Sequence, residues 1–291
     1  MAKGRELKGR IKSVENTRKI TRTMEMVATS KMKRAQDRVV AARPYAQALT
    51  EVISSLYSAE LAEKFPLLRQ PVQPKRVALV VLTSNRGLAG GFNANIIKEA
   101  RARLAELEKA GTQVDVHVVG KKGVGYFKYV GRTLASQRID ITDRPTAQNA
   151  SELVDELMAS YVAGTLDGVY VSYSKFNSVL STPPTTDRVL PVTPPKAASG
   201  EGTTQRDYLL FPSADAILTE LLPAYVRNSV YRALVETVAG EQSARRTAMK
   251  NATDNAGDIL NVLRRTYNRA RQAQITQEIA EIVGGASALE G

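Results

Sequence analysis

The chain has 291 residues, 43% of them hydrophobic, a formal net charge of +12, no cysteine and one histidine. This length and apolar content allow a sizeable core, while the lack of cysteine excludes disulfides, thiol nucleophiles and zinc-thiolate sites. The single histidine, His117, lies in the strand-like run QVDVHVV. A single histidine cannot build a typical metal site. A Ser-His-Asp triad would have to use His117, and we expect this residue to be an ordinary strand residue instead. No run of 18 apolar residues or signal-like N-terminus occurs, so we expect neither a membrane span nor export.

The positive charge is concentrated in two segments. Residues 1–43 carry 13 Lys and Arg against 4 Asp and Glu, and residues 243–275 carry 7 against 2. The remainder of the chain is slightly acidic. Such segments are either solvated helix faces or surfaces for an acidic partner, which is protein or nucleic acid.

Residues 1–57 predict one long amphipathic helix. Alternating steps of four and three from Leu7 select fifteen positions, twelve of them apolar, which is typical of a coiled-coil seam. The seam is interrupted at residues 18–25. There, three residues suggest a shifted apolar face: Ile20, Met24 and Val27.

Residues 76–192 have a different pattern, in which apolar β-branched runs alternate with helical segments. Strands are expected at 76–82, 114–120, 168–176 and 188–192, and helices at 93–109 and from about Ser151. The alternation predicts a small doubly wound α/β (Rossmann-like) domain. Residues 193–206 are expected to form a flexible loop.

A second long helix is expected from Ser213, which can cap it, to the pair Gly284 and Gly285. Alternating steps of four and three residues from Ile217 select nineteen positions, fourteen of them apolar. Two such seams predict an antiparallel coiled coil of the N- and C-terminal helices. The expected domains are therefore a discontinuous shaft, 1–70 with 212–291, and an α/β domain, 75–211.

If the end of the first helix lies beside the start of the second, paired residues have numbers that add up to about 270. This register pairs Ile11 with Ile259 and places Arg245 and Arg246 near Met24. Residues beyond about 269 then have no partner in the first helix. Four apolar residues of that overhang need another cover, such as a socket in a partner: Ile275, Ile279, Ile282 and Val283.

Four segments resemble the gamma subunits of bacterial-type F-type ATP synthases. They are NTRKITRTMEMVATSKMKRAQ (16–36), LTSNRGLAGGFNANI (82–96), SARRTAMKNATDNAGDIL (243–260) and YNRARQAQITQEIAEIVGGASAL (267–289). Ala89 stands where many relatives carry cysteine. The cysteine-bearing insert of plant chloroplast forms is absent, so thiol control is not expected.

The resemblance implies a central rotor stalk without catalysis of its own. It couples ion-driven rotation of the membrane ring to ATP synthesis or hydrolysis in a head of alpha and beta subunits. The epsilon subunit and the c-subunit ring are the other implied partners, and Mg-ATP and ADP are bound by partner subunits rather than by this chain. The implied location is peripheral, at the cytoplasmic face of the bacterial plasma membrane, with membrane association through the complex alone.

The resemblance also implies contact residues. Those expected to touch the head are Met24, Arg245, Arg271, Gln272, Gln274 and Thr276. Arg86 and Tyr208 are expected on the lower face, toward the ring and epsilon.

Other functions fit parts of the sequence. Gly87, Gly90 and Gly91 follow a strand and precede a helix, as a phosphate cradle would, and GKKGVG (120–125) is a second candidate. Neither has P-loop or Rossmann spacing, so a tight turn or protein contact is the alternative. The basic helices also suit a nucleic-acid-binding protein, although no recognised module is present and no nucleic acid is expected. An enzyme would need a convergent acid–base set, which the sequence lacks.

Overall fold

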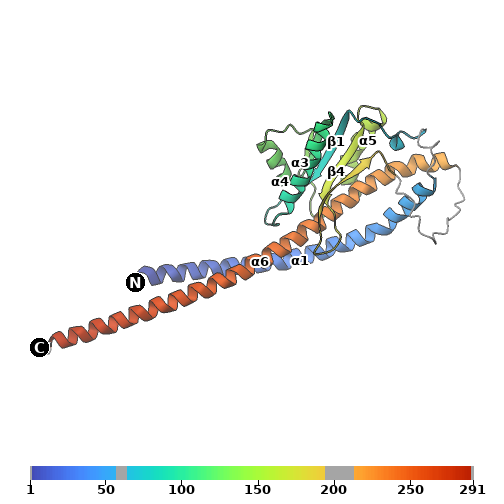
Figure 1. Cartoon of the computed structure of the whole chain (residues 1–291). Helices are drawn as coiled ribbons and strands as arrows, with labels where there is room; N and C mark the ends of the chain where they lie inside the picture. The colour runs from blue at the N-terminus through green and yellow to red at the C-terminus, as the bar shows by residue number, and fades with distance from the viewer. Residues whose placement is uncertain (1, 57–63, 194–212, 290–291) are drawn as a thin grey trace, which may run out of the picture. The chain divides into compact units, whose positions relative to one another are not determined.

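The computed structural model describes residues 2–56, 64–193 and 213–289 (Figure 1). Two long helices, α1 (Ala2–Leu56) and α6 (Ala214–Leu289), precede and follow an α/β region. Its elements in chain order are η1 (Pro66–Leu68), β1 (Arg76–Leu82), α3 (Phe92–Lys109), β2 (Gln113–Val119), α4 (Lys121–Tyr129), β3 (Ser136–Arg138), α5 (Ala147–Val162), β4 (Gly168–Ser174) and β5 (Pro184–Leu190).

The chain divides into two compact units. One unit combines Met1–Ala28 with Arg245–Gly291, and we call it the helix-pair unit. The other, Thr29–Ala244, contains the sheet together with parts of both long helices, and we call it the sheet unit. The boundaries expected from the sequence, 1–70 with 212–291 and 75–211, remain predictions about which parts fold independently.

The five-stranded sheet has the order β3-β2-β1-β4-β5. The first four strands are parallel, and β5 runs antiparallel to β4. This order, with two strands on one side of β1 and β4 on the other, is doubly wound, as predicted. Three elements were not predicted from the sequence: η1, the three-residue strand β3, and α4, which begins within the GKKGVG segment.

Strand β1 is buried on both faces, which explains its unbroken apolar sequence RVALVVL. Val77, Leu79 and Val81 pack in one cluster with α3 and α4. The alternate residues of the strand, Ala78, Val80 and Leu82, pack in another cluster with α5 and α6. The sheet unit is therefore a three-layer sandwich, with α3 and α4 on one side of β1 and β4 and α6 on the other (Figure 1).

In the sheet unit, α6 has two apolar faces. The face that packs on the sheet carries Leu218, Leu222, Val226, Val230 and Leu234. A second face, with Val235, Val238 and Ala239, packs against Ala35 and Val39 of α1. All residues from 233 to 243 are buried as a result. The sequence predicted a single apolar seam for α6. In the structure, α6 uses one apolar face to pack on the sheet and another to pack against α1.

In the helix-pair unit, α1 and α6 are antiparallel, as predicted. The hydroxyls of Thr21 and Thr253 lie 2.8 Å apart, and an Arg264–Glu15 ion pair spans 2.6 Å. Thr21 opposite Thr253 means that paired numbers add up to about 274, so the predicted register was wrong by about one helical turn. In the observed register, Met24 lies level with Lys250 rather than with Arg245.

The shifted face expected near residues 18–25 was also wrong. The regular seam continues through Thr21, which is buried, while Ile20 and Val27 are 60% and 50% exposed. The threonine fits the seam because its hydroxyl is paired with that of Thr253. Ile20 and Val27 therefore do not belong to the seam, whereas Met24 is half-buried.

The predicted start of α6 is confirmed, but its predicted end was wrong. The Ser213 hydroxyl accepts a hydrogen bond from the Ala216 N–H at 3.2 Å, as an N-cap does. The helix then continues through Gly284 and Gly285 to Leu289. Neither glycine has the positive φ of a helix-ending residue. Glycine in a helix interior costs only about 1 kcal/mol, so its presence alone does not end a helix.

Candidate functional site

The predicted head-contacting residues differ in exposure. Arg245 is buried, and Met24 and Gln274 are half-buried. The exposed members of the set are Arg271, Gln272 and Thr276. Arg86 is exposed on the turn after β1, whereas Tyr208 lies outside the described residues. These residues remain predicted contacts with the head, the ring and epsilon.

The last turns of α6 expose an apolar face. Ile275, Ile279, Ile282 and Val283 have between 47% and 71% of their surface exposed. Among residues 271–285, only Gln274 is even half-buried. This exposure agrees with the expectation that residues beyond about 269 have no partner in the first helix.

Within the sheet unit, polar contacts fix the long helices to the α/β layers. Lys31 of α1 forms an ion pair with Asp143, and Arg38 donates to the Asp143 carbonyl at 3.2 Å. On α6, Arg227 makes two hydrogen bonds to Asp155 of α5, at 2.8 and 3.0 Å. Both long helices are thus tied to the sandwich by charged groups as well as by apolar packing.

Helix α6 approaches β4 closely at Gly240. A Cβ atom there would lie 2.5 Å from the Ser174 hydroxyl oxygen, so only glycine allows this spacing. One turn earlier, the Glu236 carboxylate accepts the Phe176 N–H at 3.0 Å, and burial raises the pKa of this carboxyl. These contacts were not predicted from the sequence. An isolated glycine and a buried glutamate within a long helical pattern are the signals that could have revealed them.

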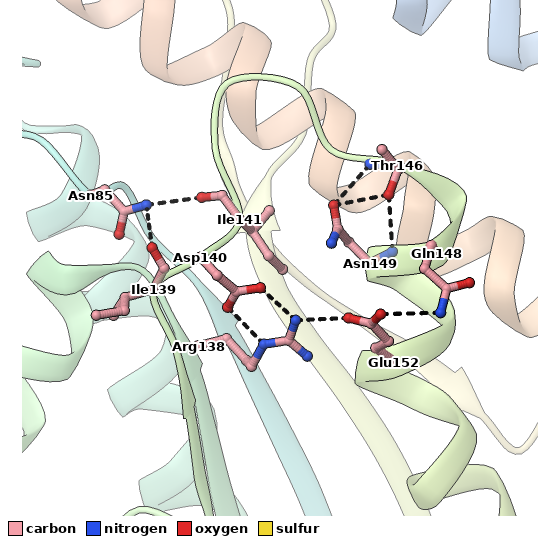
Figure 2. A network of polar contacts seen from close by, with 9 residues as sticks. All are labelled: Asn85, Arg138, Ile139, Asp140, Ile141, Thr146, Gln148, Asn149 and Glu152. Carbon is pink, nitrogen blue, oxygen red and sulfur yellow. Dashed lines mark hydrogen bonds and ion pairs between the residues drawn. The ribbon is translucent and has the colours of Figure 1, made fainter.

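The loop between β3 and α5 is held by side chains at both ends (Figure 2). Near its start, Arg138 donates to Asp140 at 2.7 and 2.6 Å and to Glu152 of α5 at 2.8 Å. At its end, Thr146 and Asn149 form a capping box that starts α5. The loop therefore has a defined path across the edge of the sheet.

Asn85 connects this loop to two other strand ends. Its amide nitrogen donates to the carbonyls of Ile139 and Ile141 at 3.1 and 2.9 Å (Figure 2). Its amide oxygen accepts the Lys121 N–H, the first of α4, at 3.0 Å. One side chain thus joins the turn after β1, the start of α4 and the loop after β3.

Replacing Arg138 with Gln is expected to reduce stability at neutral pH but not in acid. Arg138 lowers the pKa of Asp140 through their hydrogen bonds. This contribution is present above the ordinary aspartate pKa and is lost as the pH falls through the lowered one. An exposed pair contributes up to about 1 kcal/mol, so urea unfolding should show a small deficit at pH 7 that vanishes in acid. Lys128→Gln, which removes an exposed charge on α4, is the control; equal pH profiles for both variants would contradict the prediction.

A crevice of about 440 Å³ opens at the carboxyl ends of β1 and β2. The turn after β1, the start of α4, the loop after β3 and one side of α6 form its walls. We call it the strand-end crevice. Its polar and charged lining includes Arg86, Lys121, Thr142, Arg144, Thr237 and Glu241.

Neither glycine-rich segment forms an open phosphate cradle. The N–H groups of Lys121, Lys122 and Gly123 donate to Asn85 Oδ1, the Ser84 carbonyl and Thr83 Oγ1, at 3.0, 3.1 and 2.9 Å. The start of α4 is thus satisfied by protein acceptors. In the other segment, Gly90 has a φ of +55° and the next two positions lead directly into α3. Its geometry is that of a tight turn.

In the described parts of the chain, no helix is both long enough and apolar enough to cross a membrane. The same residues hold no group of three or more histidine, aspartate or glutamate side chains arranged to bind a metal ion. His117 bonds Ser136 Oγ through Nδ1 at 2.7 Å, and burial lowers the pKa of its imidazole.

Comparison with known proteins gives consistent results. The family model described as ATP synthase matches residues 3–289. The ATP synthase gamma chain of Gemmatimonas aurantiaca is 69% identical over 291 residues, covering 100% of both chains. The ATP synthase gamma chain of a Janthinobacterium species is 40% identical over 289 residues, covering 99% of this chain and 100% of that one.

Solved structures share the fold. The rotor of the Euglena gracilis mitochondrial ATP synthase has 20% identity and a TM-score of 0.66, covering 94% of this chain and 99% of that chain. A Tetrahymena thermophila mitochondrial ATP synthase chain, from a structure of the central stalk and c-ring, has 25% identity and a TM-score of 0.60. That match covers 80% of this chain and 99% of the other.

The fold and the contacts define a class of protein in which antiparallel terminal helices are built into an α/β sandwich. Within that class, the chain belongs to the ATP synthase gamma chain family. The resemblance stated from the sequence is therefore confirmed. The comparisons do not support the nucleic-acid-binding alternative.

Proposed function

We propose that this chain is the central rotor stalk of an F-type ATP synthase. The observation that carries the proposal is the 69% identity to an ATP synthase gamma chain over the whole length. The stalk couples ion-driven rotation of the c-subunit ring to ATP synthesis or hydrolysis in the alpha and beta subunits. Catalysis, with the binding of Mg-ATP and ADP, belongs to those partners, and this chain is non-catalytic.

The structure supports this role through the way α6 is shared. A rotor must pass torque from the part that meets the ring to the part that meets the head. Helix α6 is packed into the sandwich and also paired with α1. The ion pairs at Asp143 and Asp155 resist sliding of the helices against the α/β layers.

The proposed contacts follow from the same assignment. The head is contacted by residues of both long helices: Met24, Arg245, Arg271, Gln272, Gln274 and Thr276. Arg86 and Tyr208 face epsilon and the ring. The exposed isoleucines near the end of α6 are covered by the head, which removes their apolar surface from water. The complex holds the chain peripherally at the cytoplasmic face of the bacterial plasma membrane.

Cross-linking tests rotation directly, because the chain contains no cysteine. Met24→Cys, paired with a cysteine on the facing surface of the head, joins a turning part to a stationary one. We expect oxidation to abolish most ATP turnover by the assembled complex, and reduction to restore it. The oxidised single-cysteine complex is the control. Undiminished turnover with the cross-link fully formed would favour a static scaffold.

A further inference from the structure

We propose that the strand-end crevice binds a small phosphorylated molecule that also carries hydroxyl groups. Its position is the first argument. In doubly wound sheets, ligands bind outside the carboxyl ends of the strands, where the strand order reverses. Here the crevice lies outside the carboxyl ends of β1 and β2, and β1 is one of the two strands, β1 and β4, between which the order reverses. Its volume of about 440 Å³ suits a ligand larger than a single phosphate.

Charge supplies the second argument. Arg86, Lys121 and Arg144 line the crevice from three different segments. Within the described residues, none of these three side chains has a hydrogen bond or ion pair, whereas the nearby Asp143 is paired with Lys31. The crevice therefore carries unpaired positive charge. Guanidinium and ammonium groups are the side chains that bind phosphate most strongly.

A buried hydroxyl supplies the third argument. Thr237 of α6 lines the crevice, is 6% exposed, and its Oγ1 has no hydrogen-bond partner among the described residues. An unpaired buried hydroxyl is unfavourable, so such groups normally have a partner. Glu241, one turn further along α6, adds a buried carboxylate to the same lining. A ligand hydroxyl would satisfy Thr237 and could also donate to Glu241.

The walls of the crevice are held in place before any ligand binds. Asn85 joins three of its segments, Arg138 fixes the start of the loop after β3, and Asp143 ties that loop to α1. A site whose walls are already ordered loses less conformational entropy on binding. Because α4 has protein acceptors for its first N–H groups, the phosphate would be held by side chains rather than by a backbone cradle.

Titration calorimetry on the full chain at low ionic strength tests the proposal with three probes: ribose 5-phosphate, inorganic phosphate and ribose. We expect saturable binding of ribose 5-phosphate, weaker binding of phosphate and none of ribose. Arg144→Gln should weaken ribose 5-phosphate at least about tenfold, because it removes a charge-assisted contact. Arg101→Gln removes an exposed charge from α3, outside the crevice, and should leave binding unchanged.

Thr237→Val separates a binding role from a structural one. The variant should weaken ribose 5-phosphate but not phosphate, while its thermal unfolding temperature stays the same or rises because an unpaired hydroxyl is gone. The proposal is overturned if ribose 5-phosphate does not bind saturably at millimolar concentration, or if Arg101→Gln weakens it as much as Arg144→Gln. Equal affinity for phosphate and ribose 5-phosphate, unaffected by Thr237→Val, would overturn the assignment of a hydroxylated ligand.

Discussion

Replacing Gly120 with Ala is expected to destabilise the sheet unit strongly. A Cβ atom at this position would lie 2.2 Å from the Thr83 carbonyl oxygen, and the residue has a φ of +97°. The clash and the unfavourable φ together should cost at least about 3 kcal/mol. Thermal unfolding should therefore shift down by roughly 6–12 °C in a unit of this size.

The neighbouring backbone cannot easily move to relieve the clash. The Gly120 N–H donates to the Arg138 carbonyl at 2.8 Å, and the Thr83 N–H donates to the Val119 carbonyl at 2.8 Å. Both bonds belong to the edge where β1, β2 and β3 end. Moving either segment would break backbone hydrogen bonds in a buried region, which is costly in itself.

Gly125 provides a matched control in the adjoining helix. An added Cβ there meets nothing within 4 Å. Gly125→Ala should therefore stabilise α4 by roughly 0.5–1 kcal/mol, since alanine is the better helix former. If Gly120→Ala unfolds at the wild-type temperature, the close approach of Thr83 and Gly120 is not required by the fold.

The contrast between these two glycines shows why the role of the glycines in GKKGVG could not be inferred from the sequence. GKKGVG contains glycines at positions that a phosphate-binding loop could use, and nothing local shows what surrounds them. In the structure, Gly120 and Gly123 are glycines because Thr83 packs against them. This reason lies 37 residues or more away along the chain, so only the folded structure reveals it.

The elements best predicted were those with strong periodicity or continuous burial. Fourteen of the fifteen α1 seam positions selected from the sequence are buried or half-buried, and only Arg18 is exposed. Strand β1 was also predicted correctly from the sequence, because a strand buried on both faces has an unbroken run of apolar residues. The weakly patterned elements α4 and β3 were missed. Each is short, and each depends on neighbouring strands rather than on its own sequence.

The register error has a different cause. A seam built on alternating steps of three and four looks nearly the same after a shift of one turn. Apolar periodicity therefore cannot distinguish paired numbers that add up to 270 from those that add up to 274. A polar pair inside the seam can make the distinction, because two buried threonines lie opposite each other in only one register. Thr21 and Thr253 form that pair here.

Candidate contact residues could be predicted from the sequence only by its resemblance to a known family. The contacts that tie the long helices to the sandwich, such as Arg227 with Asp155, join residues 72 positions apart. Charged residues on a predicted helix normally suggest a solvated face, so these pairs gave no signal in one sequence. The strand-end crevice was likewise hidden, since its lining comes from four separate segments.

The double variant Thr21→Cys and Thr253→Cys is expected to form an internal disulfide almost completely on oxidation. The two hydroxyl oxygens are 2.8 Å apart and both residues are buried in the seam. Cysteine sulfurs in these positions need only a small adjustment to reach the disulfide bond length of about 2.05 Å. The closed loop is long, so the bond should stabilise the chain by about 2–4 kcal/mol.

The matched comparison is Ile11→Cys with Ile259→Cys, the pair favoured by the register taken from the sequence. Ile259 is half exposed, and the observed register offsets it from Ile11 by one turn. That offset amounts to about 6 Å along the helix axis. The Cα atoms are then beyond the reach of a disulfide, so little cross-link should form. Efficient bonding of this pair, with none at Thr21 and Thr253, would show that the register of the structure is wrong.

The same disulfide also bears on the proposed rotation. Thr21 and Thr253 belong to one chain, so their bond joins two parts that turn together. ATP turnover by the assembled complex should therefore remain close to that of the reduced protein. A cross-link from Met24→Cys to the head should stop turnover, although Met24 is less than one turn of α1 away. Two bonds at nearly the same level of the helix thus have opposite expected effects, and the difference arises only if α1 and α6 rotate together against the head. Loss of turnover with the internal bond alone would mean that the helices must move relative to each other.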